Sequence, residues 1–215
     1  MIQDEAGNDV IVSYWDEDKF KQVYENAKKG EVEAQAAIGY LYLAGKFVGL
    51  DYEKAEFWLK KAAEANDSEA QFNLAYLYHK QDKFEESLSW YKKSAELGYS
   101  EAQLNLALLL TEDAHFNLDE AIMWFKKAIE NGNRKAYFPL AWWYLNELEL
   151  NKEEEGLALL KIAAEDQDPD AEFMLGELYE TGDLVEKDLE KSKILYKKAS
   201  FHGSLEAVEK LKQME

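Results

Sequence analysis

The sequence contains no cysteine among its 215 residues. Disulfide bonds, zinc sites built from thiolates and cysteine nucleophiles are therefore excluded, whereas the redox compartment is left open. No apolar run approaches the roughly 18 residues that a membrane span needs. The first fifteen residues also lack the basic start and the long apolar stretch of a signal peptide. We expect a cytoplasmic protein as the sequence stands, and a periplasmic or secreted one if a signal peptide was removed.

Positive charge is scarce, because 25 basic residues face 44 acidic ones and leave a formal net charge of −19. Such a chain repels nucleic-acid phosphates and anionic membranes, so we expect neither as a partner and predict no membrane insertion. Residues 165–190 hold eleven acids and a single base, Lys187. This acidic patch has two interpretations: a solvated rim that keeps the protein soluble, or a docking surface for a basic partner.

Motifs for catalysis and for cofactor binding are missing as well. The histidines His79, His115 and His202 lack the close spacing of a metal site, and the sequence has no glycine-rich phosphate loop and no metalloprotease or nucleophile-elbow motif. Carboxylate pairs are so common in this chain that choosing a catalytic pair would be arbitrary. We therefore predict a protein that is not an enzyme, without catalytic residues, metal or cofactor.

The sequence also contains a partial calcium-loop pattern. Asp166, Asp168, Asp170 and Glu177 fall at positions 1, 3, 5 and 12 of such a loop. Ala171 replaces the glycine that the loop turn requires, and the repeat pattern described next starts a helix there. We therefore expect no calcium site.

What the sequence does contain is an internal repeat, which must be tested for before single helices are assigned. An alanine opens each unit, and the openings are 36, 32, 34, 35 and 36 residues apart: Ala34, Ala70, Ala102, Ala136, Ala171 and Ala207. A small residue precedes each following opening by 15 residues: Ala55, Ser87, Ala121, Gly156 and Ser192. All length variation lies between these two landmarks, which indicates a helix pair joined by a variable internal turn. Apolar residues within each segment recur at helical spacing.

The two ends of the chain hold incomplete units. Residues 16–29 are predicted to form a lone helix capped by Asp16, and residues 205–214 a second lone helix with a more polar surface. The sequence thus predicts an all-α chain of twelve helices, with residues 1–15 as an N-terminal tail and 16–215 as one solenoid. Small residues on facing helices, such as Gly176 and Ser192, are expected to let the helix axes approach closely. The tryptophans Trp58, Trp90 and Trp124 on the second helices are interpreted as packing residues.

The repeat resembles the Sel-one-like repeats, close relatives of the tetratricopeptide repeats, over about residues 16–214. In the last unit the resemblance rests on these residues: Ala171, Leu175, Gly176, Tyr179, Gly182, Asp188, Lys191, Ser192, Leu195, Tyr196, Lys198, Ala199 and Gly203. It implies a right-handed alpha-alpha superhelical solenoid of five helix pairs with one capping helix at each end. It also implies scaffold or adaptor work between proteins, often in bacteria.

The resemblance further implies that the first helix of each pair lines a concave groove. The side chains two, six and nine residues after each opening alanine then face a partner, and we predict these contacts: Tyr40, Phe72, Tyr76, His79, Leu108, Phe138, Trp142, Phe173, Glu177 and Glu180. The residues two positions after each opening alanine, such as Phe72, form a first column that is also expected to pack between repeats. Tyr40, Tyr76 and Trp142, six positions after the alanine, are therefore the stronger candidates for partner contact. The groove suits a protein or peptide with basic and apolar residues.

Two other functions stay open. The acidic surface and small size also fit an immunity or inhibitor protein that neutralises a cognate secreted toxin by plugging its active site. A hydrolase built on a repeat scaffold is the third possibility, and it requires a cleft that the sequence does not predict.

Overall fold

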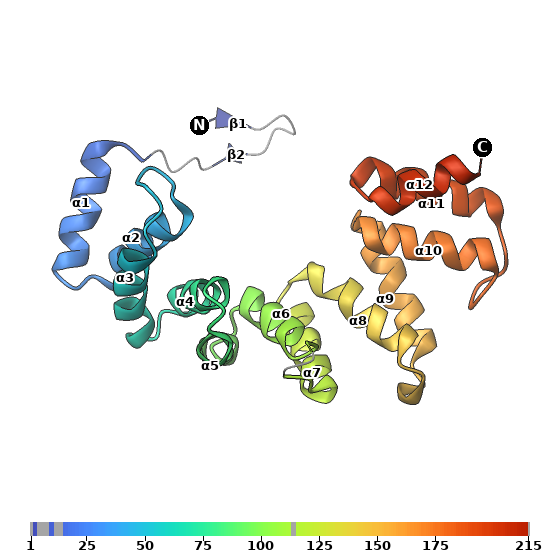
Figure 1. Ribbon diagram of the computed structural model, residues 1–215, viewed down its shortest axis with the longest axis horizontal. Helices are drawn as coiled ribbons and strands as arrows, with labels where there is room; N and C mark the ends of the chain where they lie inside the picture. The colour runs from blue at the N-terminus through green and yellow to red at the C-terminus, as the bar shows by residue number, and fades with distance from the viewer. Residues whose placement is uncertain (1, 4–8, 11–14, 113–114, 215) are drawn as a thin grey trace. The chain divides into compact units, whose positions relative to one another are not determined.

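The computed structural model describes residues 2–3, 9–10, 15–112 and 115–214 (Figure 1). The described residues form twelve α-helices: α1 (Glu17–Lys28), α2 (Val32–Ala44), α3 (Tyr52–Glu64), α4 (Ser68–Lys80), α5 (Phe84–Glu96), α6 (Ser100–Leu109), α7 (Leu118–Glu130), α8 (Tyr137–Asn146), α9 (Glu153–Glu165), α10 (Pro169–Thr181), α11 (Leu189–His202) and α12 (Leu205–Gln213). Two single-turn 3-10 helices, η1 (Arg134–Ala136) and η2 (Leu148–Leu150), flank α8. The predicted all-α fold of five helix pairs with a lone helix at each end is confirmed.

A small hairpin adds to this pattern near the N-terminus. Strand β1 (Ile2–Gln3) pairs antiparallel with β2 (Asp9–Val10), so that Ile2 lies opposite Val10. The sequence predicts only a tail over residues 1–15, and most of that tail lies outside the described residues.

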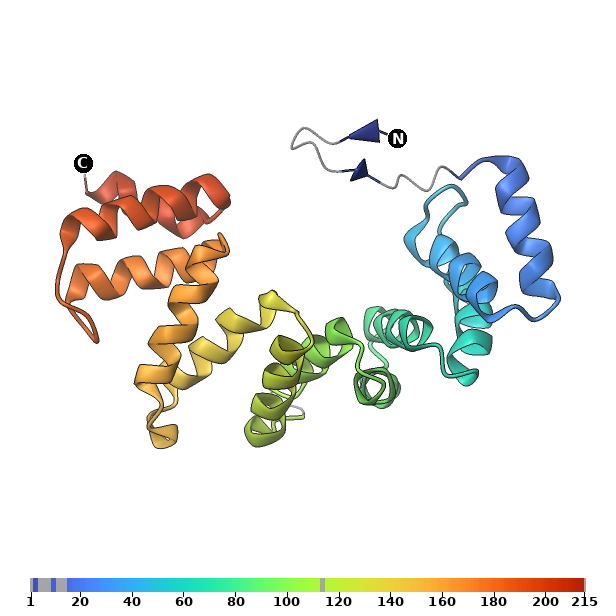
Figure 2. The same cartoon turned by 180° about the vertical axis from the view of Figure 1, so that it is seen from behind.

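The chain divides into two compact units, residues 1–97 and 98–215. In the first unit α2 packs against α1 and α3, and α4 packs against α3 and α5 (Figure 1). In the second, α6 pairs with α7 and α8 with α9, while α10 packs against α9 and α11, and α12 against α11 (Figure 2). Each element thus contacts mainly its neighbours in sequence, as expected for stacked repeats. The prediction of one solenoid domain over 16–215 stays a prediction.

Close contact between the two helices of a pair depends on the small residues that the sequence indicates. A Cβ atom added at Gly39 in α2 would lie 2.6 Å from Cγ of Leu59 in α3, and one at Gly176 would lie 2.8 Å from the Tyr196 ring. In the second pair the Ser87 hydroxyl donates to the Ala75 carbonyl at 2.9 Å. Of these contacts, the one between Ser87 and Ala75 joins two small residues as predicted, whereas Gly39 and Gly176 receive the bulky side chains of Leu59 and Tyr196. Trp58 and Trp124 are buried, which confirms their packing role.

Aspartates and other short polar residues start most of the helices. Their side chains accept a hydrogen bond from a backbone N–H of the first turn, which satisfies a donor that the helix itself cannot. These N-caps are Asp16, Asp51, Asp67, Asn117, Asp168, Asp188 and Ser204. The predicted cap of α1 by Asp16 is confirmed.

The turn from one repeat to the next always includes a residue with positive φ. Glycine takes this conformation at four of the described turns, for example at Gly132, but Asn66 and Gln167 take it with φ of 64° and 65°. Left-handed backbone is strained for residues that carry a Cβ atom. Gln167 thus adopts the left-handed turn conformation that glycine takes in other repeats, although glutamine is not a residue that predicts such a turn.

Candidate protein-binding surface and pocket

Four large apolar side chains are exposed at one equivalent position of successive first helices. Tyr40 and Tyr76 are each 39% exposed, Leu108 is 41% exposed and Trp142 is 40% exposed. Each residue stands six positions after the opening alanine of its repeat. We call these four residues the exposed column. Most other apolar side chains of the first helices are buried in the core. In both units, the side chains of the exposed column are accessible to a partner.

Lysines cover part of the exposed column in the first unit. The Lys46 ammonium lies 5.7 Å from the ring centroid of Tyr40, and that of Lys80 lies 5.3 Å from Tyr76. Among the described residues, no lysine or arginine lies over Trp142, whose ring makes an edge contact with Trp143 at 4.9 Å. Trp142 therefore offers the least covered ring of the column. The surface around Tyr40 and Tyr76 therefore includes the side chains of two lysines.

The phenylalanines of the first column contribute to packing. The ring of Phe72 lies 5.7 Å from Tyr91 in α5, and that of Phe173 lies 5.4 Å from Tyr196 in α11. Phe138 is partly buried and packs against the cluster that includes Leu160. The Phe72 and Phe173 rings thus join the two helices of one repeat, and the expectation that this column packs between repeats stays a prediction.

His79 is half-buried and lies edge-on to Phe84, with ring centroids 5.6 Å apart. Its Nδ1 atom is buried and has no hydrogen-bond partner among the described residues. His79 therefore contributes an aromatic surface next to Tyr76, and its ring is held by α5 as much as by α4.

Glu177 and Glu180 occupy very different environments on α10. The Glu180 carboxylate accepts a hydrogen bond from the Tyr196 hydroxyl at 2.6 Å and pairs with Lys210 at 3.0 Å. These contacts hold the pKa of Glu180 below its usual value. Burial raises the pKa of Glu177, and the nearby Glu180 charge adds to that effect. Glu177 thus resembles a partly desolvated acid next to the C-terminal helix, and Glu180 is already bound within the protein.

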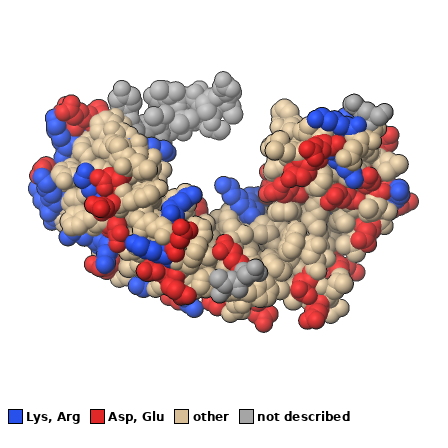
Figure 3. Space-filling view, viewed as in Figure 1, with Lys and Arg blue, Asp and Glu red and all other residues tan. Residues whose placement is uncertain are grey.

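The acidic patch at residues 165–190 is partly used by internal contacts. Arg134 binds Asp166 through two nitrogen atoms, with Nε 2.5 Å from Oδ2. Asp168 and Asp188 cap helices, and Glu172 is buried. The second unit as a whole is the more acidic one: it has 25 acidic and 13 basic residues, whereas the first unit has 19 acidic and 12 basic residues. On the face drawn in Figure 3, acidic side chains prevail on the C-terminal unit, whereas lysines lie among them on the N-terminal unit.

Two residues of the calcium-loop pattern make contacts within the fold. Asp168 caps α10 and Asp166 holds Arg134, so these two carboxylates serve the fold. Over the described part of the chain, no group of three or more His, Cys, Asp or Glu side chains is arranged to hold a metal ion.

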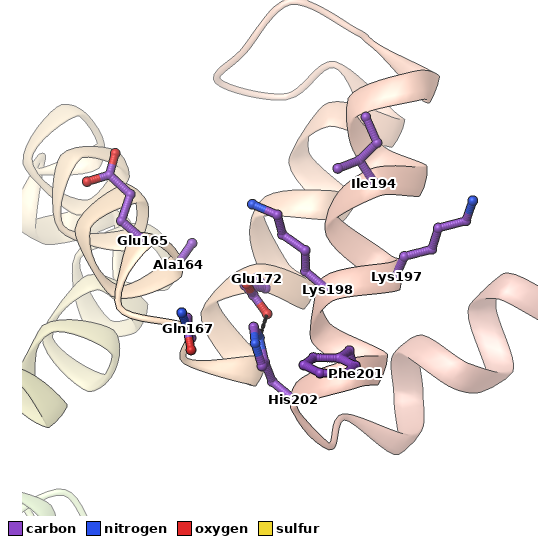
Figure 4. A pocket seen from close by; sticks show the side chains of 9 residues that line it. All are labelled: Ala164, Glu165, Gln167, Glu172, Ile194, Lys197, Lys198, Phe201 and His202. Carbon is purple, nitrogen blue, oxygen red and sulfur yellow. Dashed lines mark hydrogen bonds and ion pairs between the residues drawn. The ribbon is translucent and has the colours of Figure 1, made fainter. Parts of the chain in front are cut away.

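The second unit also has a pocket of about 620 Å³ that the sequence does not predict as a site (Figure 4). Its walls come from the end of α9, the start of α10 and the outer face of α11: Ala164, Glu165, Gln167, Glu172, Ile194, Lys197, Lys198, Phe201 and His202. At its base His202 Nδ1 lies 2.7 Å from Glu172 Oε2, and Glu172 is 1% exposed. A polar pair thus lies beneath a rim of apolar and basic side chains. The signal in the sequence is one position of the second helices, which is glutamate in four repeats and Phe201 in the fifth.

Comparisons with known proteins place these features in a family. The Sel1 repeat matches five consecutive segments, residues 32–67, 68–99, 100–133, 134–168 and 169–203, which together span most of the chain. The chain belongs to the Sel1 repeat family. The exposed column therefore recurs once in each of the first four Sel1 repeats, and the pocket lies in the fifth, with the end of α9 from the fourth.

The solved structures include a Sel1 repeat protein from Oxalobacter formigenes, which is 28% identical with a TM-score of 0.77. That match covers 90% of this chain and 87% of the other. An immunity protein from Pseudomonas aeruginosa has a similar fold at 21% identity, with a TM-score of 0.52 and coverage of 91% of this chain and 69% of that one.

A curated relative, a putative sel1-like repeat-containing protein of Acanthamoeba polyphaga mimivirus, is 33% identical over 66 residues. The match spans 31% of this chain and only 12% of that relative. Within the described part of this Sel1 repeat protein, no helix is both long enough and apolar enough to cross a bilayer.

Proposed function

We propose that this Sel1 repeat protein is a scaffold or adaptor that binds a protein or peptide partner through the exposed column of its first helices. One observation carries the proposal: Tyr40, Tyr76, Leu108 and Trp142 repeat at one position with nearly equal exposure of about two fifths. A packing residue would be buried at such a position, as the neighbouring alanines and leucines are. Recurrent, rigid and exposed rings supply contact area at a small entropic cost.

The side chains on this surface indicate which chemical class of partner it can bind. Trp142 offers an uncovered indole face for an apolar anchor, and Glu177 offers a carboxylate for a lysine or arginine. The ammonium groups of Lys46 and Lys80 next to the tyrosines favour a partner that also carries acidic or carbonyl groups there. A segment with apolar anchors and mixed charge fits better than a purely basic one. The proposed mechanism is recognition by a preformed surface, without a chemical step.

Photo-crosslinking in the producing cells tests this proposal. Benzoylphenylalanine in place of Trp142 is expected to crosslink a partner that the same group in place of Phe57 does not, because Phe57 is exposed on the second helix α3. The double variant Trp142→Ala with Tyr76→Ala should then weaken capture of that partner at least about tenfold, since two anchors are removed. The matched control is Phe57→Ala with Met123→Ala, which removes two exposed apolar side chains from second helices. Equal capture by both double variants contradicts the proposal.

An immunity or inhibitor function is the second candidate, because a solved immunity protein shares the fold and the second unit here is strongly acidic. In this function the solenoid covers the active site of a basic toxin. The expected result is rescue of cells that express the cognate toxin, with binding that weakens steeply as salt rises. Failure to rescue cells from any toxin encoded nearby counts against this candidate and leaves the scaffold proposal intact.

A further inference from the structure

The second helices of the five repeats share a pattern of charged residues that changes in the last repeat. Each second helix has a lysine five residues after its small residue (Ala55, Ser87, Ala121, Gly156 or Ser192): Lys60, Lys92, Lys126, Lys161 and Lys197. Nine residues after it, four have glutamate and the last has phenylalanine: Glu64, Glu96, Glu130, Glu165 and Phe201. Lysine and glutamate four residues apart lie on one helix face and offset each other. On α11 this acid is replaced by an aromatic ring.

The replacement leaves an unusual surface on α11. Phe201 is 86% exposed, and Ile194, two turns earlier on the same face, is 53% exposed. Within the described residues, neither Lys197 nor Lys198 forms an ion pair with an acid. The Phe201 ring makes an edge contact with the neighbouring His202 ring at 5.3 Å, but most of its surface stays in water beside two lysines without ion pairs, which is costly to hydrate.

The pocket next to this face gives it a defined shape. Figure 4 shows the Lys198 side chain extending toward α9 and the Lys197 side chain pointing to the opposite side, with Phe201 below them. The base is the Glu172 and His202 pair, whose atoms lie 2.7 Å apart, so the buried carboxylate is already satisfied. Glu165 stands on the α9 wall. Its charge repels an acid from that wall and leaves the α11 side favourable.

We propose that this pocket docks a segment of a protein partner in which a carboxylate stands next to an aromatic or aliphatic side chain. The carboxylate binds Lys198, with Lys197 as a second cation at the rim, and the apolar side chain packs on Phe201 and Ile194. Charge complementarity selects this occupant, because the α11 wall offers cations and apolar area without an acid. The site does not include any residue of the exposed column, so it stands or fails separately from the function proposed above.

An NMR titration of the full chain tests the site with two blocked peptides. The probe is acetyl-Asp-Leu-Phe-Asp-amide, and its control is acetyl-Asn-Leu-Phe-Asn-amide, which has the same shape without charge. The acidic probe should shift the backbone amide signals of Ile194, Lys198 and His202, with an affinity at least about fivefold higher than that of the neutral peptide. No shift at these amides, or equal affinity for the two peptides, overturns the proposal.

Two exposed-site variants with matched controls complete the test. Phe201→Glu restores the acid that the other four second helices have, and Lys198→Ala removes the inner cation. Each variant should lower the affinity for the acidic peptide at least about threefold. Leu205→Glu, at a side chain that is 75% exposed, introduces the same charge nearby, and Lys212→Ala removes a lysine from α12. These two controls should leave binding unchanged. An affinity that is unchanged in Phe201→Glu, or that falls equally in the control variants, overturns the proposed site.

Discussion

The Tyr196 hydroxyl donates to the Glu180 carboxylate at 2.6 Å and joins α11 to α10. The same carboxylate lies 3.0 Å from Lys210 of α12, so a single acid links three consecutive helices. Tyr196 is fully buried, and its burial together with this hydrogen bond raises the pKa of the phenol. The end of the chain therefore depends on a charge that its sequence alone would assign to the surface.

Glu180→Gln should destabilise the protein by about 1 kcal/mol at neutral pH, because the amide keeps the tyrosine contact and loses the ion pair. The folded-state pKa of Glu180 is lowered from 4.5, so its contribution is complete above that value and is lost as the pH falls through the folded pKa. The difference between variant and parent in urea unfolding should therefore shrink in acid. Glu209→Gln, exposed on α12, is the control and should change stability by less than about 0.5 kcal/mol. A difference that is independent of pH contradicts this role.

Gly39→Ala tests the close contact between α2 and α3. The added Cβ atom would lie 2.6 Å from Leu59 Cγ and 2.9 Å from the Leu59 backbone nitrogen. A backbone atom cannot move aside as a side chain can, so we expect a loss of about 1–3 kcal/mol in thermal or urea unfolding. Gly49→Ala, where an added Cβ meets nothing within 4 Å, should be nearly neutral. Equal stability of the two variants would show that the helix pair has room to separate.

Gln167→Gly should stabilise the protein, because this exposed residue holds φ of 65° at a turn that glycine occupies elsewhere. Relief of left-handed strain is expected to contribute about 1 kcal/mol. The reciprocal change Gly132→Gln should cost a similar amount, since Gly132 has φ of 85° and open space around its Cα atom. Opposite shifts of the unfolding midpoint, at equal dependence on urea, are the expected outcome. Shifts of the same sign contradict the explanation.

The repeat was predictable from sequence because stacked helices keep a constant spacing wherever they pack. The distance of 15 residues from Ser192 to Ala207 survives in all five units, whereas the internal turns vary. That spacing fixes the helix count and the position of the exposed column. It does not fix which side chain fills the space at a small residue: Gly176 receives the Tyr196 ring and not the predicted Ser192.

Contacts between side chains that are distant in sequence were not predictable in this way. The sequence assigns Glu180 to a partner, yet its charge is bound by Lys210, which lies 30 positions later and outside the repeat pattern. Cation placement over Tyr40 and Tyr76 depends on the rotamers of Lys46 and Lys80, which no spacing fixes. The pocket at α11 had a visible signal, the glutamate that becomes Phe201, but its meaning required the neighbouring α9 wall.

The buried pair of Glu172 and His202 provides the last prediction. Three earlier repeats have glutamine at the position of Glu172. In the first two, the amide of Gln35 donates to the Ala27 carbonyl at 3.1 Å, and that of Gln71 donates to the Ala63 carbonyl at 3.0 Å. Glu172, only 1% exposed, cannot donate as a carboxylate and instead accepts a bond from His202. Glu172→Gln should therefore be tolerated within about 1 kcal/mol, because the repeat already accommodates that amide.

His202→Ala should be far more damaging than Glu172→Gln, because it leaves a buried carboxylate without its partner and costs about 3 kcal/mol or more at neutral pH. Combining the two changes should recover most of that loss, since no buried charge then remains, and urea unfolding of the four proteins measures the coupling. Asn131→Ala is the matched control: Asn131 donates to Gln103 at 2.9 Å at the same place in the third repeat, and that pair is neutral. Its loss should cost only about 1 kcal/mol. Equal losses for His202→Ala and Asn131→Ala would mean that the charge of Glu172 is satisfied by something other than His202.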